Sequence, residues 1–141
     1  MVNALRFRTD NGHEEPAVTL EAFLGQSNAT AVRIEPGDDV RALIPHLDRI
    51  GLIDISFPKF RDGRGYSAAR ILREAGYSGE LRASGDVLVD QIAPMRRCGF
   101  DSFVADAELD QAAVDRALGF YDEVYQKAAD GRSPVWALRH G

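Results

Sequence analysis

The chain has 141 residues, of which 45% are hydrophobic and 28% charged, with a formal net charge of −5 and one cysteine. A chain of this length fits one globular domain, and a lone cysteine excludes an intramolecular disulfide, a CxxC redox pair and a multi-cysteine metal site. The acidic balance argues against general affinity for nucleic acid, and the sequence shows neither a run of about 20 apolar residues nor a signal peptide. We therefore expect a cytoplasmic protein with no membrane span, no metal and no intrinsic cofactor.

Strand-like runs alternate with segments of helical period, which is the pattern of βα units and a mainly parallel sheet. The expected strands are 29–34, 52–57, 79–83 and 102–105, and the expected helices are 39–50, 67–75, 86–98 and 109–128. Gly76 and Gly99 are suited to end two of these helices, whereas Pro94 should kink or split the helix in which it lies. Four to five βα units predict a single α/β domain that is either open and three-layered or half-barrel-like.

The segments on either side of this core, residues 29–129, are harder to interpret. The N-terminal extension, residues 1–28, suggests a short strand over 4–7 and a short helix over 20–24. The tail, residues 130–141, holds the only tryptophan, Trp136. Four or five βα units are too few to close a barrel, so a homodimer could cover the sheet edges that remain open.

The basic residues are concentrated in the middle of the chain. Residues 56–97 carry a net charge of +3, so the remainder carries −8. This segment contains the loop 58–65, in which three cations and two glycines follow a strand and precede a helix. The carboxyl ends of parallel strands form the ligand-binding edge of α/β proteins, and backbone amides and guanidinium groups can together hold a phosphate or sulfate there. The same edge should receive Glu35 and Asp38 after the first strand of the core.

We therefore predict a small anionic ligand at this edge. The residues expected to bind it are Lys59, Arg61, Asp62, Gly63, Arg64, Gly65 and Ser67, with Ser84 and Asp86 after the next strand.

Two other interpretations of this loop remain open. Asp62 followed by Gly63 is typical of a turn, in which the arginines are solvated and the glycines only permit positive φ. Residues 63–68 also fit the G-x-G-x-x-A form of the dinucleotide fingerprint, with Asp86 about 20 residues further on. That match would indicate a borrowed nicotinamide or flavin cofactor, but the fingerprint normally follows its strand directly, and here a loop intervenes.

Three further polar residues have structural interpretations. Alternation places Asp54 on the face opposite Ile53 and Ile55, and we interpret this as an edge strand or a partly wet face. Cys98 is expected to be a small buried residue at a helix end, because the helix dipole disfavours a thiolate there. Asp86 is expected to cap the helix that begins at its position.

The run Phe57-Pro58-Lys59-Phe60-Arg61-Asp62-Gly63-Arg64-Gly65-Tyr66-Ser67 resembles a bacterial domain-of-unknown-function family. The likeness continues through residues 69–73, 79–88, 90–91 and 96–103, roughly a third to a half of the chain. Members of that family are often labelled as oxidoreductases and are encoded beside the genes of assimilatory sulfite reductase and phosphoadenylylsulfate reductase. The resemblance implies a role in sulfate assimilation and leaves the mechanism open.

The leading hypothesis is an accessory protein of assimilatory sulfate reduction. It would bind an oxyanion, or the anionic group of a larger ligand, through the loop cations over the backbone of residues 63–65, with Ser84 and Asp86 orienting the ligand. One alternative is a small enzyme acting on a phosphorylated or sulfonated metabolite, with Asp62 or Asp86 as the general base. Another is a non-catalytic module that docks on a sulfite reductase subunit.

Overall fold

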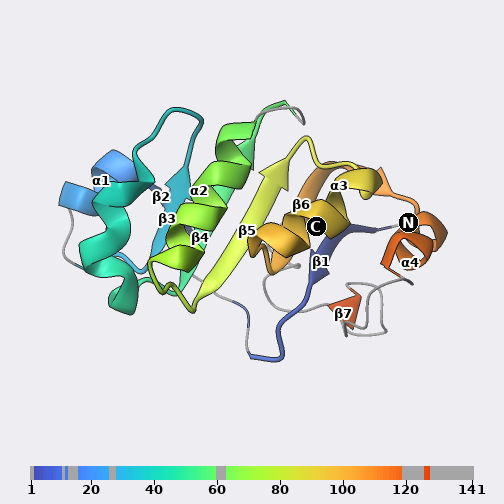
Figure 1. The fold of residues 1–141 in the computed structure, drawn as a ribbon, viewed down its shortest axis with the longest axis horizontal. Helices are drawn as coiled ribbons and strands as arrows, with labels where there is room; N and C mark the ends of the chain where they lie inside the picture. Colours follow the sequence, from blue (N-terminus) through green and yellow to red (C-terminus); the bar gives the residue numbers. More distant parts are fainter. Residues whose placement is uncertain are drawn as a thin grey trace.

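The computed structural model describes residues 2–10, 12, 16–25, 28–59, 63–118 and 126–127. Its strands are β1 (Val2–Arg6), β2 (Val18–Thr19), β3 (Ala31–Ile34), β4 (Leu52–Phe57), β5 (Glu80–Gly85), β6 (Ser102–Leu109) and β7 (Gln126–Lys127). Its helices are α1 (Leu20–Gly25), the 3-10 helix η1 (Val40–Arg49), α2 (Gly63–Glu74), α3 (Val89–Cys98) and α4 (Gln111–Leu118). Together they form one α/β domain, as predicted (Figure 1).

The strands form one sheet in the order β2-β3-β4-β5-β6-β1-β7. Strands β2 to β6 pair in parallel, each beside the next in sequence, whereas β1 pairs antiparallel with both β6 and β7. The expected mainly parallel sheet is therefore confirmed. The first 28 residues contribute two of its strands, because β1 lies inside the sheet and β2 lies at its edge.

The connecting helices form one layer over the sheet. Right-handed crossovers between successive neighbouring strands place every helix on the same face. Contacts run from η1 to α2, from α2 to α3 and from α3 to α4, and Figure 1 shows α2 and α3 lying in front of the strands. The beginnings of η1, α2 and α3 therefore follow the carboxyl ends of β3, β4 and β5, which creates the predicted ligand edge.

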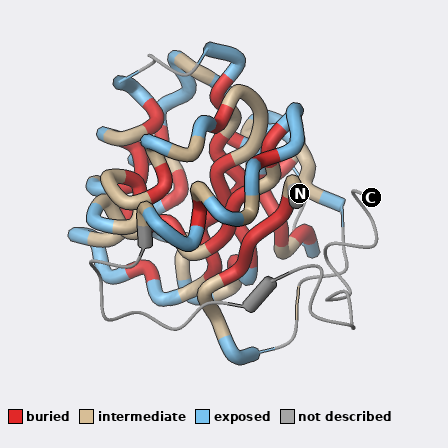
Figure 2. The backbone as a smooth tube through the Cα atoms, turned by 90° about the vertical axis from the view of Figure 1, so that its right-hand side faces the viewer, coloured by how far each residue is buried: buried red, intermediate tan, exposed pale blue. Residues whose placement is uncertain are grey.

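The hydrophobic core lies between this helix layer and the sheet. The side chains of Ile53, Ile55 and Phe57 alternate along β4 toward the helices and are at most 1% exposed. Leu72 of α2 and Ile92 of α3 pack in the same buried cluster. Figure 2 shows the buried segments through the middle of the molecule and the exposed segments mainly around them. Burial of such side chains stabilises the domain by about 1.5 to 3 kcal/mol each.

The opposite face of the sheet carries a row of charged and polar residues, which is buried on β4, β5 and β6 and exposed at Arg33 on β3. Cross-strand pairing aligns Arg33 with Asp54, Asp54 with Arg82, and Arg82 with Ser102. Asp54 accepts a hydrogen bond of 2.5 Å from Ser84 Oγ, and its other oxygen lies 3.8 Å from Arg82 Nη1. Burial lowers the pKa of Arg82, while Asp54 and Glu80 oppose that shift.

The interpretation of Asp54 as an edge or partly wet residue is therefore wrong. Strand β4 lies in the interior of the sheet, and Asp54 is only 2% exposed. Its carboxylate is tolerated there because the neighbouring strand supplies a hydroxyl donor and a guanidinium, the partners that a buried charge requires.

Several element boundaries differ from the prediction. Helix α2 begins at Gly63, four residues earlier than expected, so both glycines of the basic loop belong to its first turn. Strand β6 extends to Leu109, and α4 therefore begins only at Gln111. The expected helix is wrong at 126–127, which form β7. Its expected course over 119–125, residue 128, the surroundings of Trp136 and the tail 130–141 lie outside the described residues.

Helix α3 also begins later than predicted. Its first residue is Val89, and the backbone N–H of Leu88 donates to Gln91 Oε1 at 3.1 Å. Asp86 is therefore not the cap, because the helix starts later and Leu88 holds the cap position; the backbone N–H of Asp86 donates to the carbonyl oxygen of Phe57 at 2.7 Å. Pro94 does not split the helix, whereas Gly99 ends it in a left-handed conformation, as predicted.

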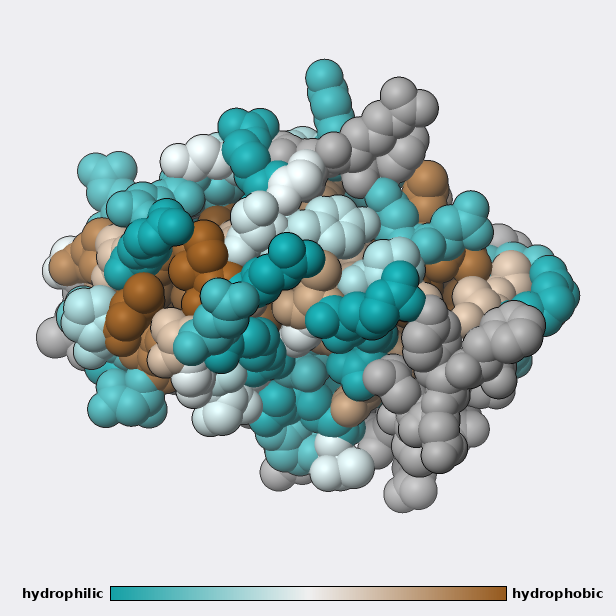
Figure 3. Space-filling view, in the orientation of Figure 1, coloured by the Kyte–Doolittle hydropathy of each residue, from teal (hydrophilic) through white to brown (hydrophobic). Residues whose placement is uncertain are grey.

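The helix-covered surface is mostly hydrophilic (Figure 3). Hydrophobic side chains gather on it toward the end that carries α1 and η1. Leu24 of α1 and Ile44 of η1 are 50% and 41% exposed. No helix among the described residues is long and apolar enough to cross a membrane.

Candidate functional site

Two adjacent pockets open where the loop 35–39, between β3 and η1, faces the beginning of α2. The inner pocket has a volume of about 20 Å³ and is lined by Ile34, Glu35, Pro36, Gly37, Asp38, Ile55, Ser56, Arg64, Gly65 and Ala68. The outer pocket is wider, with a volume of about 440 Å³, and is lined by Gly37, Asp38, Asp39, Val40, Arg41, Gly63, Arg64, Ser67, Ala68 and Ile71. Gly37, Asp38, Arg64 and Ala68 belong to both linings, so they stand between the two pockets.

The loop 35–39 owes its shape to its own acidic residues. The backbone N–H of Asp38 donates to the carbonyl oxygen of Glu35 at 3.0 Å, and the Asp38 carboxylate accepts from the backbone N–H of Glu35 at 2.9 Å. The Asp39 carboxylate accepts from the backbone N–H of Arg41 at 3.0 Å and so caps η1. These two carboxylates therefore hold the loop in place.

Gly37 lets this loop pass close to α2. Its φ is +93°, a conformation that side chains disfavour. A Cβ atom at this position would lie 3.8 Å from Arg64 Nη1. The turn therefore brings the backbone close to Arg64, and the lack of a side chain leaves the space between the two pockets open.

The glycines of the basic motif serve different purposes. Gly65 is buried against the ring of Phe57, and a Cβ atom there would lie 2.3 Å from Phe57 Cζ. Gly63 has open space where its Cβ would stand. Gly65 thus lets the first turn of α2 rest on Phe57, and this packing explains the glycine without a dinucleotide. The geometry consequently adds no support for the nicotinamide or flavin interpretation.

Several polar side chains beside the two pockets have no described partner. Within the part of the chain that the structure describes, the guanidinium of Arg41 and the hydroxyl of Ser67 make no hydrogen bond or ion pair, and both residues line the outer pocket. The carboxylate of Glu35 and the hydroxyl of Ser56 likewise have no described partner, and both residues belong to the lining of the inner pocket. Gly63 and Arg64 in the first turn of α2 also line the outer pocket, near the positive end of the helix dipole.

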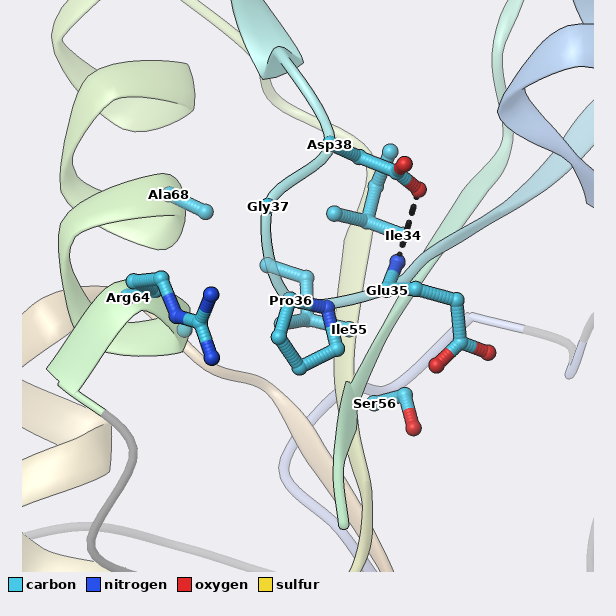
Figure 4. A pocket seen from close by; sticks show the side chains of 10 residues that line it. Ile34, Glu35, Pro36, Gly37, Asp38, Ile55, Ser56, Arg64 and Ala68 are labelled. Carbon is cyan, nitrogen blue, oxygen red and sulfur yellow. Dashed lines mark hydrogen bonds between the residues drawn. The ribbon is translucent and has the colours of Figure 1, made fainter. Parts of the chain in front are cut away.

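Figure 4 shows how these groups are distributed around the loop. The Arg64 side chain reaches from α2 toward Pro36, whereas Glu35 and Ser56 lie beyond Pro36, at the ends of β3 and β4. Arg64 therefore stands on the α2 side of the loop, and Glu35 and Ser56 stand on the side of the strand ends.

The structure brings only some of the predicted site residues together. Gly63, Arg64, Gly65 and Ser67 all line one or both pockets. Lys59 is exposed at the end of β4 and lines neither. Arg61 and Asp62 lie outside the described residues.

Ser84 and Asp86 occupy a different place. Neither lines the two pockets. The proton of Ser84 Oγ is directed to Asp54, so this hydroxyl is poorly placed to donate to an oxyanion. Gly85 between them has φ +109°, and a Cβ atom there would lie 2.5 Å from the carbonyl oxygen of Phe57.

Arg41 is the site residue that the sequence interpretation missed. The sequence predicts a helix over 39–50 and gives no role to its charged residues. A usable signal was nevertheless present, because the Pro36-Gly37 turn at the carboxyl end of a strand brings the start of the next helix to the ligand edge.

Cys98 and the acidic side chains form no second reactive centre among the described residues. Cys98 is half-buried at the end of α3, and its Sγ accepts a hydrogen bond of 3.6 Å from Arg70 Nη2. In the same part of the chain, no group of three or more His, Cys, Asp or Glu residues is arranged to hold a metal ion.

A mainly parallel α/β domain with charged residues around a pocket at its carboxyl edge is a general ligand-binding architecture. The architecture alone does not specify an activity. The family model described as "Bacterial protein of unknown function (DUF934)" matches residues 31–136. The chain belongs to this family, which confirms the resemblance to a bacterial family of unknown function. No curated protein and no solved structure matches the chain.

Proposed function

We propose that this protein binds a small ligand through a phosphate or sulfate group in the outer pocket. The observation that carries the proposal is the convergence of Arg41, Arg64 and Ser67 on that one pocket. Arg41 comes from η1, and the other two come from the first turns of α2. Guanidinium groups bind such oxyanions by paired hydrogen bonds, and the amino end of α2 adds backbone donors and a favourable dipole.

The affinity should be modest. A hydrogen bond to a charged group contributes about 1.5 to 3 kcal/mol, and a helix end adds about 0.3 to 1 kcal/mol. The pocket is open to solvent, and Asp38 and Asp39 on its rim reduce the positive potential. We therefore expect a binding site in the micromolar to millimolar range rather than a tightly held cofactor.

The proposed biological setting follows from the family resemblance. We place the protein as an accessory component of assimilatory sulfate reduction, a pathway whose intermediates include sulfate, sulfite and phosphosulfate groups. The pocket suits this setting because its donors match the oxyanion groups of such compounds.

Calorimetry at low ionic strength tests the proposal with inorganic phosphate, sulfate and sulfite. The wild-type protein should bind at least one of them, and the affinity should fall as salt is added. An Arg41→Gln/Arg64→Gln variant should lose at least about tenfold in affinity, the equivalent of one charged hydrogen bond. Arg116→Gln provides the matched control, because Arg116 is exposed on α4 outside both pocket linings.

Two outcomes would overturn the proposal. One is the absence of salt-dependent binding by the wild-type protein. The other is equal affinity in the double variant and the wild type. A separate Arg61→Gln variant measures what the predicted loop cation adds to the pair.

A further inference from the structure

The outer pocket is larger than an inorganic oxyanion requires. Its volume of about 440 Å³ lies in the range of about 300 to 1,000 Å³ that is typical of pockets for small organic ligands. On α2 its lining runs from Gly63 to Ile71, which is about 12 Å along the helix axis at a rise of about 1.5 Å per residue. Arg64 and Ser67 lie in the first part of that length. The remaining space is available to the rest of the ligand.

One stripe of α2 faces this space. Figure 4 shows the side chains of Arg64 and Ala68 projecting from α2 toward the loop 35–39. Ile71 continues the same stripe, because residues i, i+4 and i+7 share one face of a helix. It lines the outer pocket and is half-buried. The stripe therefore changes from a cation near the beginning of α2 to apolar side chains further along.

The apolar part of the lining lies close to the anion-binding groups. Val40 of η1 and Ala68 are 3% and 8% exposed and form the floor of the pocket. Ser67 precedes Ile71 by four residues, which is about 6 Å along the axis. A group attached directly to an oxyanion at Ser67 would therefore reach Ile71 without a polar linker between them.

The charges of the lining favour a ligand with one anionic group. Arg41 and Arg64 are matched in number by Asp38 and Asp39. The described lining supplies no further cation for a second anionic group, which would instead approach the two carboxylates. An apolar group in the same place leaves water and gains free energy from doing so.

We infer that the ligand is a phosphate or sulfate monoester of an apolar alcohol or phenol, with its oxyanion at Arg41, Arg64 and Ser67 and its hydrocarbon part against Ile71. This inference rests on the proposed function and adds to it the class of the esterified group. Phosphate and sulfate esters share this chemistry, so the experiment compares both.

The inference is tested by calorimetry with esters of equal charge that differ in their hydrocarbon part. We expect the wild-type protein to bind phenyl phosphate about tenfold more tightly than methyl phosphate, because burying about 55 Å² of apolar surface provides that gain. Glycerol 3-phosphate is larger than methyl phosphate but hydroxylated, and it should bind no more tightly than methyl phosphate. Phenyl sulfate and methyl sulfate form the parallel pair, and the tighter of the two phenyl esters identifies the oxyanion.

Variants assign the preference to Ile71. Ile71→Thr should reduce the ratio of the phenyl and methyl phosphate affinities to within about threefold, because apolar surface is lost, while the affinity for inorganic phosphate stays the same. Ile71→Leu should retain the preference. Ile44→Thr is the matched control, because Ile44 is 41% exposed on η1 outside the pocket lining. Thermal unfolding of each variant verifies that the fold is intact.

The outcomes separate this inference from the proposed function. Binding of inorganic phosphate with no preference for the phenyl esters would overturn the inference and leave the proposed function standing. The same holds if glycerol 3-phosphate binds as tightly as phenyl phosphate, or if Ile71→Thr retains the full preference. Absence of binding by any of these anions would overturn the proposed function and the inference with it.

Discussion

The arginines at the two ends of the parallel strands have contrasting surroundings. At the amino end, Arg73 donates to the carbonyl oxygens of Tyr77, Gly79 and Gly99 and to the Asp101 carboxylate, at 2.6 to 3.0 Å. At the carboxyl end, the guanidinium of Arg41 makes no hydrogen bond or ion pair in the described part of the chain. The same residue type thus fastens loops together at one end and stands available to a ligand at the other.

A second arginine strengthens the contrast. Arg6 at the amino end is 2% exposed, and its Nε and Nη2 donate to Glu80 Oε1 at 3.2 and 2.9 Å. Ser102 Oγ donates to the other Glu80 oxygen at 2.7 Å. The pair joins β1 to β5 across β6, so it fixes the antiparallel strand within the sheet. The arginines of this chain therefore have two roles, which follow from their position along the strands. Those at the amino end hold loops and strands together, and those at the carboxyl end are available to a ligand.

The largest expected effect on stability comes from removing the Arg73 guanidinium at the amino end of the strands. Arg73→Ala would leave three carbonyl groups and Asp101 without this guanidinium, and we expect the free energy of unfolding to fall by about 3 to 5 kcal/mol. Arg73→Lys should lose nearly as much, since an ammonium cannot reach all four acceptors from one position. Urea denaturation measures both. If Arg73→Ala lowers the free energy of unfolding by less than Arg64→Gln does, the structural role of the amino-end arginines is contradicted.

Glycine substitutions sharpen the comparison at the carboxyl end. Gly65→Ala forces a methyl group against the Phe57 ring and should destabilise the protein by about 1 to 3 kcal/mol. Gly63→Ala places the same methyl group in open space and should change stability by less than about 0.5 kcal/mol. The same denaturation experiment compares them. Equal effects would mean that Gly65 does not serve helix packing.

A pH-dependent effect belongs to the amino end. Hydrogen bonds from Arg8 and Arg6, outweighing the effect of burial, lower the pKa of Asp10 from 3.8 to about 2. Because the folded-state pKa is depressed, this carboxylate stabilises the fold above pH 3.8, and its contribution is lost as the pH falls toward 2. Asp10 is half-exposed, so screening limits the effect at pH 7 to about 1 kcal/mol or less.

Comparison of Asp10→Asn with the wild type tests this pH dependence. The difference in unfolding free energy should be constant from pH 7 to about 5 and should shrink between pH 4 and 2. A difference that grows on acidification would show that the sign is wrong.

The fold could be predicted well because it follows from local patterns. The spacing of apolar residues and the turn residues predicted the helices and parallel strands of the core. Gly99 correctly predicted the end of a helix. The errors arose where distant residues decide the structure. Asp54 is buried because Arg82 and Ser84 come from the neighbouring strand, and strand pairing cannot be deduced from the local sequence. Likewise, Asp86 does not cap α3, because β5 runs to Gly85 and the helix begins only at Val89, with Leu88 at the cap position.

The site was predicted in part for the same reason. The Gly63–Ser67 segment is contiguous, so one motif located four of the pocket residues. The sequence predicts Glu35 at this edge because it follows β3, whereas Arg41 belongs to η1 and lines a pocket only because the β3–η1 turn brings it to α2. Gly65 shows the reverse case, in which a motif that suggests ligand contact is explained by the ring of Phe57 lying underneath it.

Nuclear magnetic resonance tests the contrast between the two ends most directly, by titrating the isotope-labelled protein with inorganic phosphate and following its backbone amides. We expect saturable shifts confined to residues 63–67 and 37–41, with the amides of Arg8, Arg73 and Arg96 unchanged. Shifts centred on those amino-end arginines, or no saturable shift at the carboxyl edge, would contradict the assignment of the anion site to that edge.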